Sequence, residues 1–315
     1  MQRSATLESK IPGQGTMRLL RTIAALALLS LAPAASACIN TIGTDHSGRK
    51  FYPNWYIGTE LTSSMRPSKL GPDDIWVRNV IEQSRKWPDF QSLNDLGVVL
   101  IRQGKYSRAI EHFLTVERLF PGRAQTAANL GTVLELSGHD RVALRWIRIG
   151  MKRDPDEHHR TEWLHGRILE AKIAMAADPN YLKGRSIAGV SFSNDLTPPL
   201  PTKLPKGNDG RPVALWELNN ALSYQLSERT TFVAAPDPVV ANLLMDWATL
   251  NLAGGPVENA AALYDLAVRY GAPRDALMDR RQAHVREVLA KADKEPKLAD
   301  IACGICQPPP EPTKD

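Results

Sequence analysis

Residues 90–157 consist of two consecutive segments of 34 residues that align with each other without a gap. A period of this length is typical of a pair of antiparallel helices that stacks on the next pair. Neither pair can bury its apolar face alone, so the sequence predicts an all-α fold of stacked helical hairpins. The positions shared by the two segments are Leu96-Gly97, Gly104, Ala109 and Pro121 in the first, and Leu130-Gly131, Gly138, Ala143 and Pro155 in the second.

Small residues at fixed places in each segment indicate how its two helices pack. A glycine inside a helix costs roughly 1 kcal/mol of helix propensity, so Gly97 and Gly131 indicate positions where a neighbouring helix comes close. The second glycine of each segment is expected to end the first helix in a left-handed conformation. The proline is expected to end the second helix, because proline cannot continue one.

The shared positions resemble those of the tetratricopeptide repeat, which has a large-small pair on its first helix, a small alanine on its second and a proline at the exit. The segment from Glu162 to Lys172 also resembles one found in exported bacterial repeat proteins of unknown role. The resemblance implies a repeat solenoid with degenerate flanking hairpins, and it implies no catalytic activity.

The distribution of proline and glycine divides the chain into parts. The flanking helices are expected at 72–86, next to the first segment, and at 156–177, where a helix without the Leu-Gly pair would cap the stack. Short extended stretches are expected at 186–192 and 229–235, and a degenerate repeat hairpin at 237–270. The predicted parts are a loop-rich arm (38–73), a repeat domain (74–178, with repeats 90–123 and 124–157), a linker or ordered loop (179–211), a C-terminal helical region (212–293) and a proline-rich tail (294–315).

Residues 1–37 have the pattern of a secretory signal peptide. Arg18 and Arg21 precede an apolar run that ends at small residues, which places the true start near Met17. Cys38 follows the small residues directly, so either it carries a lipid or cleavage simply leaves it as the first residue. Both alternatives predict an exported protein, periplasmic or lipid-anchored to the bacterial envelope.

Charge and motif content argue against two functional classes. The net charge is +5, and residues 1–37 contribute four basic side chains and one acidic one, so the remainder is only weakly basic. A nucleic-acid-binding protein is therefore not expected. The sequence has no G-x-S-x-G nucleophile motif and no glycine-rich phosphate loop, so we predict a protein without enzymatic activity, and no cofactor.

The first helix of each repeat lines the concave face of a solenoid, which is the surface such proteins use for binding. Its residues outside the core include Val98, Ala128 and Glu135. By analogy with the family, an asparagine beside the Leu-Gly pair would hydrogen-bond a peptide backbone; this is Asn129, and Asp95 corresponds to it in the first repeat. The predicted peptide-binding residues are Asn94, Asp95, Arg102, Asn129 and Thr132.

Two clusters support an alternative, a metal-binding or thiol-redox envelope protein. His158 and His165 lie seven residues apart, on one face of a continuous helix, with Glu162 between them. Three such side chains can be metal ligands, although the order is not that of zinc proteases. Cys303 and Cys306 form a C-x-x-C, for which a structural disulfide is favoured over redox or metal chemistry in an exported chain.

Four aromatic residues gather in the loop-rich arm: Phe51, Tyr52, Trp55 and Tyr56. They could form a binding lip or pin the arm to the helices. Because aromatic side chains contribute so much to burial, pinning is the favoured interpretation.

Overall fold

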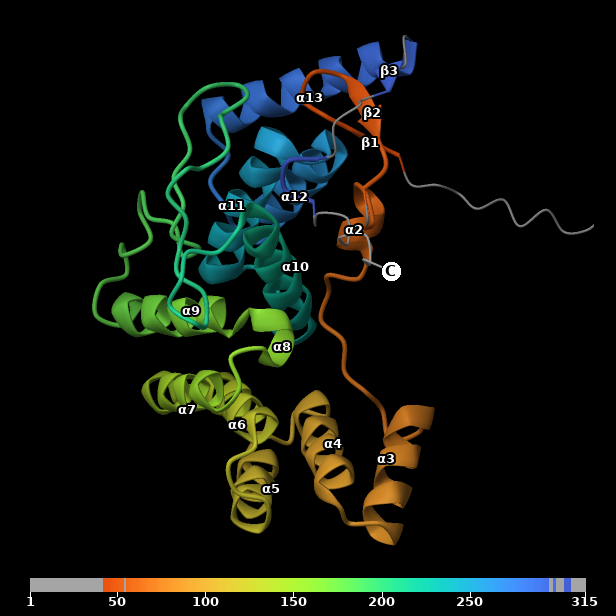
Figure 1. Cartoon of the computed structure of the whole chain (residues 1–315), viewed down its shortest axis with the longest axis vertical. Coiled ribbons are helices and arrows are strands. Elements are labelled where there is room, and N and C mark those ends of the chain that lie inside the picture. The colour runs from red at the N-terminus through yellow and green to blue at the C-terminus, as the bar shows by residue number, and fades with distance from the viewer. Residues whose placement is uncertain (1–41, 54, 295–296, 299–302, 307–315) are drawn as a thin grey trace, which may run out of the picture. The chain divides into compact units, whose positions relative to one another are not determined.

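The structure, a computed structural model, describes residues 42–53, 55–294, 297–298 and 303–306, which all belong to one compact unit. Twelve helices and three short strands form within these residues, so the predicted all-α class is confirmed (Figure 1). None of these helices is both long enough and apolar enough to cross a bilayer. In chain order the helices are α2 (Thr59–Ser63), α3 (Ile75–Lys86), α4 (Phe90–Arg102), α5 (Tyr106–Leu119), α6 (Ala124–Leu136), α7 (Asp140–Arg153), α8 (Glu157–Arg160), α9 (Glu162–Met175), α10 (Leu215–Phe232), α11 (Pro238–Gly254), α12 (Val257–Arg269) and α13 (Ala276–Lys294).

Helices α4 to α7 reproduce the sequence period in three dimensions. Helix α6 begins and ends 34 residues after α4, and α7 begins and ends 34 residues after α5. The turns also match: Gly104 and Gly138 have φ angles of 72° and 78°, the left-handed conformation expected of them. The helix ends predicted at these glycines and at Pro121 and Pro155 are therefore confirmed.

The glycines of the Leu-Gly pairs lie where the two helices of each hairpin come closest. A Cβ on Gly97 would lie 2.6 Å from Cε1 of Phe113, and one on Gly131 would lie 2.7 Å from Cγ1 of Ile147. Phe113 and Ile147 are fully buried. Because any side chain at either glycine would overlap its buried partner, the close approach predicted from the sequence is confirmed.

Helix α3 packs on α4, as expected for the flanking helix, but the segment after α7 differs from the expectation. Asp156–Ala177 does not form one helix, because residues 158–160 adopt left-handed backbone angles and α9 begins only at Glu162. The side chain of Asn208 bridges this turn: it accepts from the Trp163 amide at 2.7 Å and donates to the Pro155 carbonyl at 2.7 Å. Helix α9 then packs on α7, α10 and α11, so it joins two parts of the fold instead of capping a stack.

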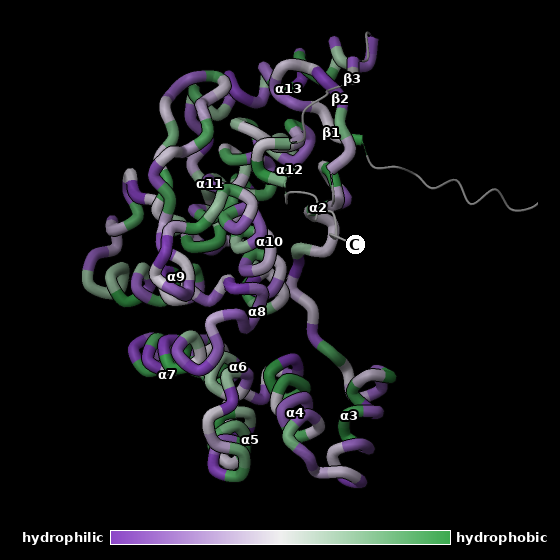
Figure 2. Tube along the Cα trace, in the orientation of Figure 1, coloured by the Kyte–Doolittle hydropathy of each residue, from purple (hydrophilic) through white to green (hydrophobic). Residues whose placement is uncertain are grey.

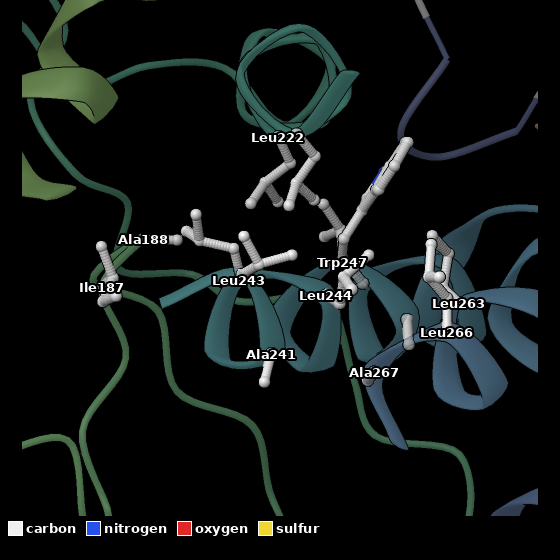
Figure 3. Close-up of a cluster of buried hydrophobic side chains, with 14 of the residues drawn as sticks. Ile187, Ala188, Leu222, Ala241, Leu243, Leu244, Trp247, Leu263, Leu266 and Ala267 are labelled. Atoms are coloured by element: carbon white, nitrogen blue, oxygen red, sulfur yellow. The ribbon is translucent and has the colours of Figure 1, made fainter. Parts of the chain in front are cut away.

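The largest hydrophobic core lies among α10, α11 and α12, where Figure 2 shows apolar residues gathered. Leu222 of α10 faces Leu243 and Trp247 of α11, and Leu263 of α12 lies beyond them (Figure 3). Helices α11 and α12 form the hairpin expected at 237–270. Helix α10 continues to Phe232, so the extended stretch expected at 229–235 is wrong.

Residues 176–214 form an ordered loop that lies against α11. The Ile187 amide donates to Asn242 Oδ1 at 2.9 Å, and Asn242 Nδ2 donates to the Arg185 carbonyl at 2.7 Å. Ile187 and Ala188 are buried in the large core. Residues 186–192 form no strand, because side chains and not a neighbouring strand satisfy this backbone. The Ile187 carbonyl accepts from Arg167 of α9, and the Gly189 and Val190 amides donate to Ser186 Oγ within the loop.

The N-terminal arm packs on the C-terminal hairpin. Strand β1 (Gly43–Thr44) pairs antiparallel with β2 (Arg49–Phe51), which pairs parallel with β3 (Lys297–Leu298). Helix α2 and β1 both contact α12. Phe51 is buried and Trp55 packs on the large core, whereas Tyr52 and Tyr56 are 59% and 64% exposed, so two of the four aromatic residues pin the arm.

Candidate functional site: a cavity between the repeats and α10

A cavity of about 130 Å³ lies between the first helices of the two repeats and α10. One wall of the cavity is partly apolar, because Phe232 of α10 and Val233, which follows this helix, line it. A group of charged side chains lines another part of it. From the repeats, the lining residues are Val98, Ile101, Arg102, Asn129, Thr132, Glu135 and Leu136.

Three of the five predicted peptide-binding residues, Arg102, Asn129 and Thr132, line this cavity. Asn94 does not line it but accepts a hydrogen bond from Asn129 Nδ2 at 3.2 Å, which orients the Asn129 amide. Asp95 lies apart and accepts from Gln91 Nε2 at 2.9 Å on its own helix. The structure therefore brings four of the five residues into one group and leaves Asp95 outside it.

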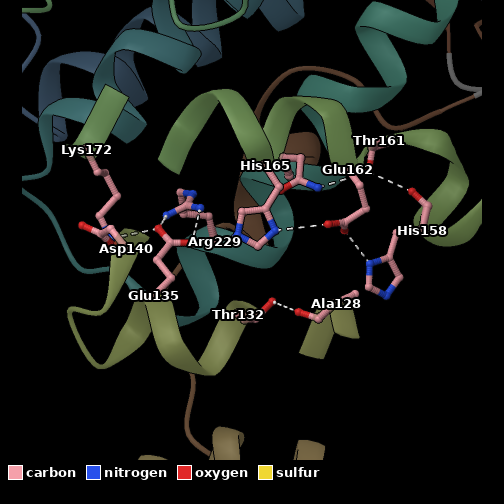
Figure 4. Close-up of polar contacts among 11 residues, drawn as sticks. Ala128, Thr132, Glu135, Asp140, His158, Thr161, Glu162, His165, Lys172 and Arg229 are labelled. Atoms are coloured by element: carbon pink, nitrogen blue, oxygen red, sulfur yellow. Dashed lines mark hydrogen bonds and ion pairs between the residues drawn. The ribbon is translucent and has the colours of Figure 1, made fainter. Parts of the chain in front are cut away.

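Glu135, expected at the solvated concave surface, is instead buried at the centre of a charge cluster (Figure 4). Its carboxylate is paired by Arg229 of α10 through both oxygens, at 2.7 and 3.1 Å, and its Oε1 also lies 3.0 Å from Lys172 Nζ. Its Oε2 lies 2.8 Å from His165 Nε2. Burial alone would raise the pKa of Glu135, but the charge of Arg229 and the hydrogen bond from His165 hold it well below its usual range.

The alignment of the two repeats contains a signal for the burial of Glu135. Glu135 occupies the place that Ile101, which is buried, has in the first repeat. An acid at a core position of a repeat requires a cationic partner, because an unpaired buried charge is strongly unfavourable. The identity of that partner could not be read from the repeats, since Arg229 lies 94 residues further along the chain.

Glu162 extends the cluster toward the left-handed turn. Its Oε1 lies 2.7 Å from His158 Nδ1, and its Oε2 lies 3.5 Å from His165 Nδ1 with no hydrogen-bond partner among the described residues. Burial opposes the charged forms of both Glu162 and His165. The hydrogen bond to His158 and the nearby His165 imidazole nevertheless lower the pKa of Glu162 to about 2, and the hydrogen bond to Glu135 and the nearby charge of Glu162 raise the pKa of His165 to about 9. At neutral pH the cluster consists of ionised acids and a charged imidazole.

Three consecutive residues without glycine form a left-handed turn beside the cavity. His158, His159 and Arg160 have φ angles of 51°, 56° and 65°. This conformation costs roughly 1–2 kcal/mol per residue, and such strain is concentrated at functional sites. The turn directs His158 to this cavity, whereas His159 and Arg160 line other hollows of the surface.

The two histidines of the predicted cluster both contact Glu162, but His158 lies outside the regular helix on which the prediction placed it. In the part of the chain that the structure describes, no three His, Cys, Asp or Glu side chains are arranged to hold a metal ion. The imidazole nitrogens face carboxylates with which they form hydrogen bonds or ion pairs. The histidines therefore serve as cationic partners of buried acids.

The hydroxyl groups that line the cavity are not arranged for nucleophilic chemistry. Thr132 Oγ1 donates to the carbonyl of Ala128 at 3.1 Å. Burial, and after it the nearby charge of Glu228, raises the pKa of Tyr224, which keeps its hydroxyl protonated. The cavity offers shape, apolar surface, hydrogen-bond donors and fixed charges, which are properties of a binding site.

Cys303 and Cys306 are joined by a disulfide, and the loop between them docks on the turn between α11 and α12. Ile305 is fully buried there, and the Gly304 amide donates to the Gly254 carbonyl at 2.9 Å. The loop holds the chain against the core at this point. Cys38, the predicted lipidation site, and the predicted signal peptide lie outside the described residues.

No protein-family model matches this chain, and the search of curated proteins found none that is similar to it.

Proposed function

We propose that this protein is a tetratricopeptide-repeat-like scaffold that binds a peptide segment of another protein across the inner face of α4 and α6. It would be exported to the bacterial envelope, either free in the periplasm or tethered through a lipid on Cys38. The observation that carries the proposal is that Arg102, Asn129 and Thr132 line one cavity with apolar residues of α10.

The geometry of Asn129 supports recognition of a peptide backbone. A side-chain amide has two N–H donors and an oxygen with two lone pairs. The contact with Asn94 uses one donor and fixes the orientation, so a donor and the oxygen stay available for a peptide group. The cavity, at about 130 Å³, is of the size of one side chain, which an adjacent peptide residue would fill.

The cluster under the cavity supports binding by keeping its shape constant. Glu135 joins α6 to α9 through His165 and to α10 through Arg229. A site that is rigid before the ligand arrives loses less entropy on binding. Glu135, His165 and Arg229 would thus act as the frame of the site, and Arg102, Asn129 and Thr132 as its contacts.

Selection of peptides from a random library on the immobilised full chain tests this proposal. Selected peptides should bind Asn129→Ala about 5- to 50-fold more weakly, which corresponds to the loss of one or two buried hydrogen bonds. The matched control is Asn180→Ala, in an exposed turn after α9. Equal affinity of the Asn129→Ala variant and the control for every selected peptide would contradict binding at the inner face.

Mass spectrometry of the N-terminus tests the proposed compartment. The chain would be produced in a bacterium and recovered from its envelope fraction. A mature terminus at Cys38 supports export, and the added mass of acyl chains on that residue would establish the tether. Recovery, from the cytosol alone, of chains that keep the residues between Met17 and Cys38 would contradict export.

A further inference from the structure

A second hollow of the surface, a cleft of about 530 Å³, shares no residue with the cavity described above. Four parts of the chain form it: the N-terminal arm, the left-handed turn, α10 and α11. Its volume is within the range of sites that take small ligands. Its lining residues are Trp55, Asp156, His159, Arg160, Trp216, Asn219, Asn220, Ser223 and Trp247.

Three of the chain's seven tryptophans gather in this cleft. Trp247 is 1% exposed and its Nε1 donates to Asn219 Oδ1 at 2.8 Å, so its indole is fixed at the base. Trp55 and Trp216 are only partly buried and belong to different segments. Flat, rigid aromatic surfaces at several edges suit a ligand that itself has flat apolar faces.

Between the aromatic rings lie small polar groups that can both donate and accept hydrogen bonds. Asn219, Asn220 and Ser223 follow Trp216 at helical spacing, so all four lie along one stripe of α10. Asn219 is 5% exposed, and its Nδ2 has no partner within the described part of the chain. The side chains of Asn220 and Ser223 likewise have none there. These groups are therefore available to a ligand.

The charges at the cleft are balanced within the protein. Arg160 lies 3.1 Å from Asp209, 3.7 Å from Asp156 and 3.9 Å from Glu217. Because acids already surround this cation, the cleft offers no net positive charge to an anionic ligand. A neutral ligand is favoured.

We propose that this cleft binds a neutral oligosaccharide. The C–H faces of a pyranose ring are flat and apolar and stack on indole rings, while its hydroxyls both donate and accept, as do the amides and hydroxyl of α10. A polyproline segment also packs on aromatic residues, but it offers carbonyl acceptors alone and would leave the acceptors of this cleft unsatisfied. The left-handed turn contributes by directing His159 and Arg160 to the rim.

Titration of the full chain with cellotetraose and with chitotetraose, followed by calorimetry and by tryptophan fluorescence, tests this site. At least one should bind at about millimolar affinity or better. Trp216→Ala should weaken that binding about tenfold or more, as removal of an aromatic anchor does, and Asn220→Ala should weaken it by a smaller factor. Circular dichroism checks that both variants keep the wild-type helix content.

Two controls separate this site from other effects. Trp87 is 72% exposed at the end of α3, so Trp87→Ala removes an indole outside the cleft and should leave the affinity unchanged. Asn129→Ala, in the other cavity, should also leave it unchanged, so the peptide site and this one are tested independently. The proposal is overturned if neither sugar binds at about 10 mM, if Trp87→Ala weakens binding as much as Trp216→Ala, or if decaproline occupies the cleft in their place.

Discussion

The imidazole of His165 on α9 lies 2.8 Å from the carboxylate of Glu135 on α6, and both side chains are almost fully buried, 6% and 4% exposed. This ion pair joins the second repeat to the helix that follows it. Through Arg229, the same carboxylate reaches α10. One buried carboxylate therefore bonds the repeats to both α9 and α10, beside the apolar contacts that Leu169 and Phe232 make with the core of the repeats.

Replacement of Glu135 should destabilise the protein strongly. Glu135→Gln keeps the volume but leaves Arg229, His165 and Lys172 without their shared anion, and removal of one partner of a buried pair costs about 3–5 kcal/mol. Urea unfolding followed by circular dichroism measures the loss. Glu111→Gln, an exposed residue of α5, is the control and should lie within about 0.5 kcal/mol of the wild type.

The contribution of His165 should depend on pH. Its pKa of about 9 in the folded state exceeds the ordinary value of 6.5, so its stabilisation is complete below pH 6.5 and is lost as the pH rises to 9. Asp246 also titrates, because burial raises its pKa to about 7. Because Asp246 is present in both proteins, its contribution cancels in the difference in unfolding free energy between the wild type and His165→Asn. This difference should fall by about 3 kcal/mol between pH 6.5 and pH 9, and a constant difference would show that the imidazole is not charged in the folded protein.

Alanine should be destabilising at Gly97 and tolerated at Gly166. A Cβ at Gly97 would overlap the buried ring of Phe113, and overpacking of a core costs about 1–3 kcal/mol. At Gly166 of α9 the nearest side-chain atom, Leu144 Cδ1, is 4.0 Å away, so alanine gains up to about 1 kcal/mol of helix propensity. Thermal unfolding of both variants compares them. Equal stability of the two would mean that α4 and α5 are not in close contact.

The usual order of alanine and glycine should be reversed at His159. Its φ angle of 56° suits glycine better than any residue with a Cβ. His159→Gly should therefore be more stable than His159→Ala by about 1 kcal/mol, although both lose the ring contact with Tyr224. At Arg145, an exposed position inside α7, the alanine variant should be the more stable by a similar amount. The same order at both positions would show that residue 159 is not held in the left-handed conformation.

The sequence was sufficient to predict the helices of the repeats because a local pattern determines them. Gly104 and Pro121 mark helix ends by their own backbone preferences, and Gly97 marks a close approach within one hairpin. Asn129 and Thr132 could be placed at the inner face for the same reason, since they share a helix with known core positions.

The left-handed turn and the charge cluster could not be predicted in this way. Histidine adopts a positive φ more often than most residues do, but the types of His158, His159 and Arg160 do not predict three such residues in a row. The turn depends on Asn208, which accepts a hydrogen bond from the Trp163 amide and lies 45 residues after it in the sequence. Glu135 and Arg229 are likewise far apart in the sequence, so their pairing follows from the tertiary arrangement of α6 and α10.

The small sheet has a consequence for the topology of the polypeptide. Strand β2 lies near the start of the described chain and pairs with β3, which lies near the end of the described chain. Lys50 of β2 also forms an ion pair with Asp293 of α13, with 3.0 Å between Nζ and Oδ1. Segments that lie so close can be joined by a short linker, and new termini can be opened at an exposed loop. The fold is therefore suited to circular permutation, with the loop between α5 and α6 at Gly122 as the natural place for the cut.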